Sequence, residues 1–497
     1  MKRIIYKISL LILLFSGSSC KKWLDLQPQD GIIRNEFWKT KEDVQAAVIG
    51  CYSSLLAAPG GIKDRPLVDY LFIWGELRAD MVDPGPGITT DELNMMYVNI
   101  LSSNALTSWK SLYRTINYCN TVIDFAPDVK KVDNTLTQAS LDAYMAEALA
   151  LRSLMYFYIV RTWGDAPLKL KSTSTDQEIQ NLGITDKAVI LNQIVADLLK
   201  AESLAATTYG NKQYDTGRIT KYTIEAMLAD VYLWMENYND CIVMCDKVID
   251  SKKFSLVPGA LMYNRVFYEG NSAEGIFEIQ FDAQKLNPFY NAFIPVTRRY
   301  NAANRVLEEI YTTDFTDETK FDFRGVDAAV RAKDIAIYKY MGIDYNTART
   351  ADVSYAHWFA YRYPDVLLMK AEACAQVDRG QDALDLVKVV RERANAMAAT
   401  EQSPDPADKD GVADYILAER AREFSFEGKR WYDILRNAKR DNYRRIDVLL
   451  NMVAASVPSD IQQSAINKYK DKNSHYLPVF DDEISADQTL KQNPFYK

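Results

Sequence analysis

The stretch YLPVFDDEISADQTLKQNPFY, residues 476–496, is the most informative part of this chain. Its fixed points are the YLPV run at 476–479, the pair Glu483-Ile484, Leu490 and the QNPFY run at 492–496. Neither the two-residue period of a strand nor the 3.6-residue period of a helix requires this residue order. The stretch is therefore a sequence signature, in which the individual residues matter more than the pattern of polarity.

Helical periodicity dominates the chain upstream of this signature. Apolar residues spaced three and four apart predict helices over 41–56, 108–124, 141–163 and 416–436. Between the first two helices, Pro66, Pro84 and Gly85-Pro86-Gly87 predict that residues 63–99 are mostly loop.

Two further blocks have the pattern of paired helices. In the first block, small and apolar residues of 226–233 and 241–248 flank a turn at Asn237-Tyr238, and the second block spans 366–394. Small residues where two helices approach closely, with a period near 34 residues, are typical of tetratricopeptide repeats. We expect four such pairs, two of them degenerate. Between 252 and 363 the helical period fades, and short strands such as 275–281 are expected within irregular chain.

The signature resembles the C-terminal hallmark of the SusD/RagB family, in which a YLPIP run is followed by QNPGY. Phe480 and Phe495 depart from that pattern. Other segments are similar to family motifs in the same order along the chain. These are Cys20 to Pro28, Trp109 to Asn120, Glu147 to Leu168, Asp322-Phe323-Arg324 and Glu419 to Arg436. The resemblance implies a mainly α-helical, tetratricopeptide-like scaffold with a loop-rich region that contains a few short β-strands.

The first residues have the three parts of an export signal. Lys2, Arg3 and Lys7 precede an apolar run that is too short to span a bilayer, and small residues then lead to Cys20. Gly17-Ser18-Ser19-Cys20 resembles a lipobox, which would make Cys20 the site of lipidation and of attachment to the outer membrane. An ordinary cleaved signal, with Cys20 as a chance thiol, is the alternative. The residues after Cys20 begin with Lys21-Lys22 and lack the acidic cluster that would mark export to the cell surface. Exposure at the cell surface is therefore expected from the family resemblance alone.

The expected organisation has five parts. They are a signal peptide at 1–19, a lipid-anchored tether at 20–40, an N-terminal helical region at 41–251, an irregular ligand-facing region at 252–363 and a C-terminal helical region at 364–497.

Charge and composition exclude several functions. The formal net charge is −8, and removal of the three basic residues of the leader makes it −11, which argues against a nucleic-acid groove. Two histidines and scattered cysteines give no metal-ligand set, and the five cysteines after Cys20 are expected to be small buried hydrophobes. No nucleophile or phosphate-binding motif is present, so no cofactor and no enzyme activity are expected.

Three glutamates spaced four residues apart could still be catalytic. Glu419, Glu423 and Glu427 would share one helix face, as an acid and base of a glycosidase must share a cleft. Arginines lie three residues away, however, so ion pairs that fix the helix against its neighbours are the preferred interpretation.

The resemblance implies non-catalytic capture of an oligosaccharide and its delivery to a SusC-like, TonB-dependent transporter in the outer membrane. Capture of peptides by the same architecture, or a helical scaffold for protein partners, are the alternatives. Candidate ligand-binding residues were chosen for their aromatic and polar side chains in loops. They are Trp74, Asp80, Tyr97, Asn99, Tyr290, Arg298, Tyr300 and Tyr340. For each of them, packing between loops is the competing explanation.

Overall fold

The computed structural model describes residues 37–58, 60, 65–175, 178–312, 320–344, 347–396 and 403–497. The predicted signal peptide, Cys20 and most of the predicted tether lie outside these residues. The chain is 57% helix and 6% strand, which confirms the mainly α-helical class. Within the described residues, no helix has the length and apolar character needed to cross a membrane.

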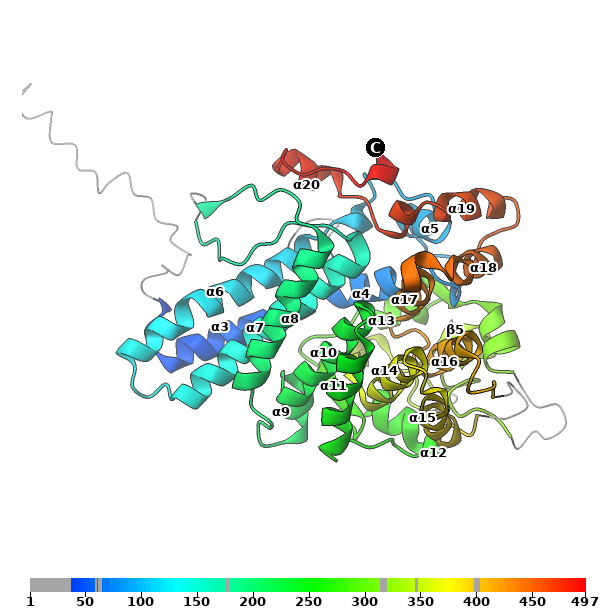
Figure 1. Cartoon of the computed structure of the whole chain (residues 1–497), viewed down its shortest axis with the longest axis horizontal. Helices are drawn as coiled ribbons and strands as arrows, with labels where there is room; N and C mark the ends of the chain where they lie inside the picture. Colours follow the sequence, from blue (N-terminus) through cyan, green and yellow to red (C-terminus); the bar gives the residue numbers. More distant parts are fainter. Residues whose placement is uncertain are drawn as a thin grey trace, which may run out of the picture.

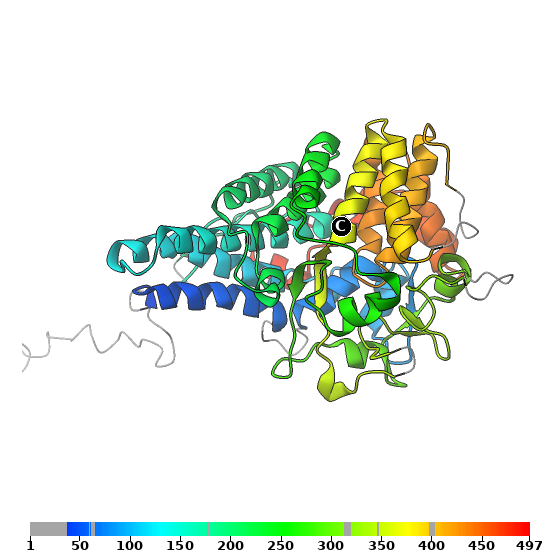
Figure 2. The same ribbon diagram turned by 90° about the horizontal axis from the view of Figure 1, so that it is seen from below.

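Four long helices build the N-terminal part of the molecule. They are α3 (Lys41–Leu56), α6 (Lys110–Val132), α7 (Gln138–Trp163) and α8 (Lys187–Leu204). The side chain of Thr40 caps α3 by accepting the N–H of Asp43, whose carboxylate accepts the N–H of Thr40 in return. Gly164 ends α7 at its C-terminus, with a positive φ of 79° that glycine adopts without strain. Figure 2 shows α3, α6 and α7 as an elongated arm.

The two predicted helix pairs are confirmed. The first is α10 (Lys221–Trp234) with α11 (Tyr238–Asp250), preceded by the short α9 (Lys212–Gly217), and the second is α14 (Tyr363–Gln376) with α15 (Gly380–Arg393). Helix α11 packs on α14, so the pairs stack directly although more than a hundred residues separate them. Figure 1 shows the resulting row from α8 through α10 and α11 to α14 and α15.

The prediction that residues 63–99 are mostly loop is wrong in part. They form α4 (Leu67–Glu76), the strand β1 (Val82–Pro84) and α5 (Thr90–Met96). All ten residues of α4 are buried, so the helix has no solvent-exposed face.

The single helix predicted over 416–436 is two helices. Helix α16 (Lys409–Glu423) ends, a turn follows, and α17 (Arg430–Tyr443) begins at a new angle. Phe426 and Gly428 in the turn have φ of 63° and 69°, which no helix can contain. Glu76 of α4 fixes the turn by accepting the N–H of Gly428 at 2.7 Å.

The irregular region contains short elements around three two-stranded sheets. Antiparallel pairing joins β1 to β3 (Tyr300–Ala302), β2 (Gly275–Ile279) to β6 (Trp358–Arg362), and β4 (Val330–Arg331) to β5 (Ala336–Ile337). The helical pieces are α12 (Gly259–Met262), two π-helices at 263–268 and 306–310, α13 (Phe289–Phe293) and a 3₁₀ turn at 351–353. A few short strands in irregular chain were predicted here, and the structure confirms them.

The C-terminal signature wraps back over the helices. It follows α18 (Ile446–Ser456) and α19 (Gln462–Tyr469) and contains α20 (Asp481–Ala486). The N–H of Leu477 donates to the carbonyl of Thr162 at 2.8 Å, which ties the signature to the end of α7. The Gln492 amide bonds both the N–H and the C=O of Val479, each at 2.8 Å, as a neighbouring strand would. The residue order 476–496 is therefore fixed by bonds between side chains and backbone, not by a periodic element.

The described cysteines are buried hydrophobes, as expected. All five lie in the interior as free thiols: Cys51, Cys119, Cys241, Cys245 and Cys374.

Candidate functional site

An open pocket lies between the segment 77–97, which was predicted as mostly loop, and the turn after α18. It has a volume of about 240 Å³ and is bordered by the strand β1, the end of α5 and the turn after α18. Its lining residues are Leu77, Ala79, Val82, Asp83, Pro84, Met96, Tyr97, Ser456, Val457 and Pro458. We call it the Asp83 pocket.

Two titratable groups line this pocket, the carboxylate of Asp83 and the hydroxyl of Tyr97. Neither the Asp83 carboxylate nor the Tyr97 hydroxyl bonds to another group in the part of the chain that the structure describes. Burial raises the pKa of Asp83 above its ordinary value, because a half-buried carboxylate loses hydration and gains no cation. Tyr97 is half-buried at the C-terminal end of α5, with its ring at the pocket wall. The other lining residues are mostly apolar in type, but polar atoms form more of the surface that lines the pocket than apolar atoms do.

Buried polar contacts hold the wall of the pocket in place. Thr89 caps α5 in a reciprocal pair with Glu92, and the Glu92 carboxylate accepts from Arg65 at 2.7 Å and Arg299 at 2.6 Å. Burial opposes ionisation of Glu92, but Arg299 and Arg65 outweigh it and hold its pKa at about 2. The N–H of Gly85 also donates to the carbonyl of Arg299. The pocket is therefore preformed rather than assembled by a ligand.

Three of the predicted aromatic ligand contacts are core residues. Trp74 is fully buried and donates its indole N–H to the carbonyl of Leu106 at 2.8 Å. Tyr300 is also fully buried, and its hydroxyl donates to Glu92 at 2.6 Å. Tyr340 is 1% exposed and stacks among other rings of the core. A stacking role for these rings does not fit the structure, because none of them offers a face to a ligand.

The carboxylate of Asp80 is also occupied by contacts within the protein. Its carboxylate accepts from Arg430 at 2.8 and 2.9 Å and from Arg305 at 2.8 Å. Burial raises its pKa, but these two cations outweigh burial and hold the pKa below its ordinary value. Asp80 therefore joins α17 to the π-helix at 306–310 and is not free for a sugar hydroxyl.

The other four candidates retain accessible surface. Tyr97 lines the Asp83 pocket, Asn99 is exposed two residues further on, and Tyr290 is half-buried. Arg298 donates to Asn301 at 2.6 Å, and Asn301 is the direct partner of Asp83 in the β1–β3 ladder. Arg298 therefore lies beside the β1–β3 pair, where it also pairs with Asp334, and it does not line the Asp83 pocket. Asp83 itself was missed, since nothing in the sequence signals a two-strand pairing across so long a separation.

Comparisons with known proteins place this arrangement in a family. A model described as "SusD family" matches residues 267–496, and one described as "Starch-binding associating with outer membrane" matches residues 88–233. The chain is similar to the SusD/RagB family along most of its length.

Relatives and solved structures match along most of the chain. The SusD-like proteins P38 and P25 of Formosa agariphila are 27% and 26% identical over 87% and 86% of this chain, and over 91% and 88% of their own length. A SusD superfamily structure from Bacteroides vulgatus has a TM-score of 0.74 at 23% identity, over 92% of this chain and 100% of that one. A SusD-like carbohydrate-binding protein from Bacteroides fragilis has a TM-score of 0.71 at 17% identity, over 92% and 100%. At these identities the structures show a shared fold.

The glutamates of the SusD/RagB motif at 419–427 are engaged by cations. Arg324 of the Asp-Phe-Arg motif donates to Glu419 and Glu423 at 2.7 Å each, and Lys339 donates to Glu427 at 2.7 Å. All three carboxylates are at most 1% exposed. Ion pairing was the preferred interpretation, but most partners come from distant segments rather than from arginines three residues away.

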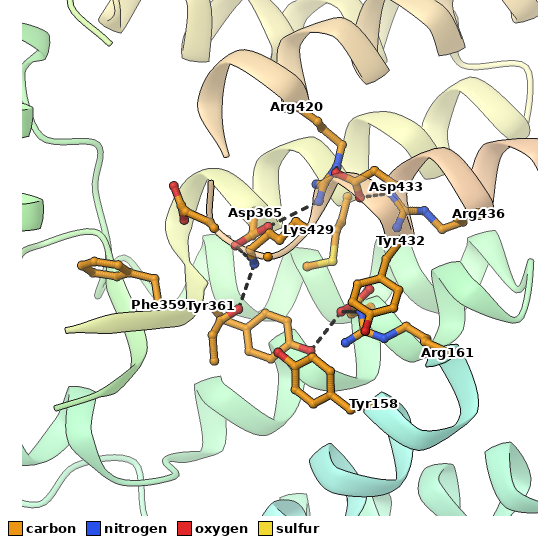
Figure 3. A pocket seen from close by; sticks show the side chains of 15 residues that line it. Tyr158, Arg161, Phe359, Tyr361, Asp365, Arg420, Lys429, Tyr432, Asp433 and Arg436 are labelled. Carbon is orange, nitrogen blue, oxygen red and sulfur yellow. Dashed lines mark hydrogen bonds and ion pairs between the residues drawn. The ribbon is translucent and has the colours of Figure 1, made fainter. Parts of the chain in front are cut away.

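A second polar site lies beside this network, and Figure 3 shows its lining. It contains the ion pair of Lys429 with Asp365 at 2.7 Å and the bond from the Tyr361 hydroxyl to Asp230 at 3.0 Å. The enclosed space is about 20 Å³, room for a single water but not for a sugar ring. The polar side chains around this cavity come from β6, α10, α14 and α17 and bind these elements to one another. The cavity is therefore part of the scaffold of the SusD/RagB fold.

Proposed function

We propose that this protein captures an oligosaccharide without catalysis in the Asp83 pocket and delivers it to a TonB-dependent transporter. The family comparison supports carbohydrate binding at the outer membrane, since one matching family model is described as starch binding in association with the outer membrane. Capture of an oligosaccharide in the Asp83 pocket is supported by one observation. The pocket is preformed, and it contains an unpartnered carboxylate and an unpartnered phenol among mostly apolar residues. Sugars present hydroxyl groups around apolar ring faces, which is the complementary pattern.

The composition of the pocket also supports binding without hydrolysis. Asp83 is the single carboxylate in the lining, whereas a glycosidase uses two that flank the scissile bond. The glutamates that could supply more are held by Arg324 and Lys339 in the interior.

Peptide capture is the second candidate within the same architecture. The apolar walls of the Asp83 pocket would accept an apolar side chain as well as a sugar face, and Asp83 would bind a peptide amine or a basic side chain. A scaffold for protein partners alone does not account for two unpartnered polar groups in a preformed pocket.

Attachment to the outer membrane through acylated Cys20, with exposure at the cell surface, completes the proposal. A protein anchored in this way cannot itself move a nutrient across the membrane, so a SusC-like transporter is the proposed partner. The helical body would then act as a rigid lid over that transporter, because stacked helix pairs transmit motion with little deformation.

Calorimetry on single variants tests the pocket once a glycan array and a peptide library have supplied a ligand. Tyr97→Ala and Asp83→Asn should each weaken binding by about 1–3 kcal/mol, as other aromatic and polar sugar contacts do. Tyr118→Ala is the matched control, because Tyr118 is an exposed tyrosine on α6, away from the pocket lining. Asn99, Tyr290 and Arg298 remain proposed contacts, to be changed in the same series. Unaltered affinity in Tyr97→Ala and Asp83→Asn, with intact circular dichroism, would place the site elsewhere.

A further inference from the structure

Arg78 is a buried cation without a counter-ion in the described structure. It lies in the turn after α4, is 2% exposed, and forms no ion pair with a described carboxylate. One of its nitrogens, Nη1, donates to the carbonyl of His475 at 2.8 Å, while Nε and Nη2 have no partner. An uncompensated charge in a protein interior is strongly unfavourable, so a compensating group is expected here.

The side chains next to Arg78 carry further polar groups without a partner. The Arg78 guanidinium lies 4.0 Å from the ring centre of Trp431, and the Trp431 ring lies 5.6 Å from that of Tyr469. The indole N–H of Trp431 and the hydroxyl of Tyr469 also have no partner within the described structure, although both residues are fully buried. Three neighbouring side chains therefore leave polar groups unpartnered beside a buried positive charge.

The neighbouring acceptors are already used. The carbonyl of Tyr469 lies 2.8 Å from His475 Nε2, and the carbonyl of His475 accepts from Arg78. Burial lowers the pKa of His475 to about 4, so this imidazole is neutral at neutral pH and adds no second charge. A water molecule would satisfy some of the donors, and the Tyr469 hydroxyl oxygen could accept one of its hydrogens, but a neutral water leaves the charge of the guanidinium uncompensated.

We propose that Arg78, Trp431 and Tyr469 bind one small monovalent anion, chloride in a saline medium. A monovalent anion would neutralise the guanidinium and could accept from it and from the neighbouring donors. The site would join the turn after α4 to α17, α19 and the C-terminal signature, which lie together in Figure 1. None of the three residues lines the Asp83 pocket, although Leu77 and Ala79 on either side of Arg78 do, and the inference does not depend on the proposed function.

Bromide is the probe for this site, because it replaces chloride and scatters anomalously. Crystals of the protein grown or soaked in sodium bromide should show an anomalous peak in contact with the Arg78 guanidinium. Density for an ordered water without anomalous signal at that position, or no density, would overturn the proposal.

Thermal unfolding measures the contribution of the ion in solution. The melting temperature of the wild type should rise by a few degrees as chloride replaces gluconate at constant ionic strength, because an anion bound only by the folded state stabilises it. Tyr469→Phe removes one donor and keeps the ring, so the chloride-dependent shift should shrink. Tyr340→Phe removes an equally buried hydroxyl without a partner elsewhere in the core and should leave the shift unchanged. Equal melting of the wild type in both salts, or equal shifts in the two variants, would contradict the proposal.

Discussion

Glu423→Gln is the sharpest test of what holds the irregular region against the C-terminal helices. The Glu423 carboxylate accepts from Arg324 at 2.7 Å, from Arg393 at 2.5 Å and from Arg362, and all of these side chains are at most 6% exposed. The three arginines come from the irregular region, α15 and β6. Glutamine keeps the shape but removes the charge, and it turns one acceptor into a donor that faces arginine donors.

The expected loss of unfolding free energy is about 3–5 kcal/mol, the range for removing one partner of a buried ion pair. That is a large fraction of the roughly 5–15 kcal/mol by which a folded protein is usually stable. Asp128→Asn is the control, because its ion pair with Lys131 has side chains 67% and 75% exposed and should be worth about 0–1 kcal/mol.

Urea unfolding followed by circular dichroism, with equal slopes for wild type and variants, measures both values. The sign of the pH dependence adds a second test. Burial raises the pKa of Glu423, but Arg393, Arg362 and Arg324 outweigh burial and hold that pKa well below its ordinary value of 4.5. The contribution of Glu423 is therefore present above pH 4.5 and is lost as the pH falls toward its native pKa, so the two proteins should converge in acid. A Glu423→Gln loss below 1 kcal/mol at neutral pH would refute the reasoning.

Three further changes have defined outcomes. Burial raises the pKa of Glu76 from 4.5 to about 8, so the native state keeps a proton that the unfolded chain loses. The free energy of unfolding should therefore fall as the pH rises from about 4.5 to 8. Glu76→Gln should flatten that pH dependence, measured by urea unfolding at several pH values. Gln492→Ala removes both bonds to Val479 and should cost roughly 1–3 kcal/mol in the same assay, whereas Gln463→Ala, on an exposed helix face, should cost little. Cys20→Ala should release the protein from washed membranes, and an unchanged membrane fraction would argue against acylation.

Helices with one buried and one exposed face were predictable from the sequence. The bounds of α3 were predicted without error, and α7 begins at residue 138 instead of the predicted 141. Helix α6 was found, but it runs to residue 132, well beyond its predicted end at 124. Helix α4 was missed because the prolines and glycines of 63–99 favoured loop, whereas Pro66 is the N-cap of α4 and Pro84 ends β1, so these two prolines border the elements rather than interrupt them. The break after α16 was hidden because the spacing of Glu423 and Glu427 matches the helical period, although the backbone between them turns through a positive φ.

The candidate site was less predictable, for a physical reason. Aromatic residues serve both as core and as stacking surfaces, and sequence does not separate the two uses. Trp74 and Tyr340 fill the interior, whereas Tyr97 lies at a pocket wall. Asp83 became visible as a candidate only through the pairing of β1 with β3, which depends on the whole fold.

The bonds of Gln492 to Val479 also bear on proteolysis. They fix a segment whose Leu477 N–H donates to the carbonyl of Thr162, at the end of α7. When this segment opens, the end of α7 is uncovered. Proteases cleave in proportion to the population of such open forms, so the amide of one glutamine limits cleavage at a helix that lies far from it in sequence.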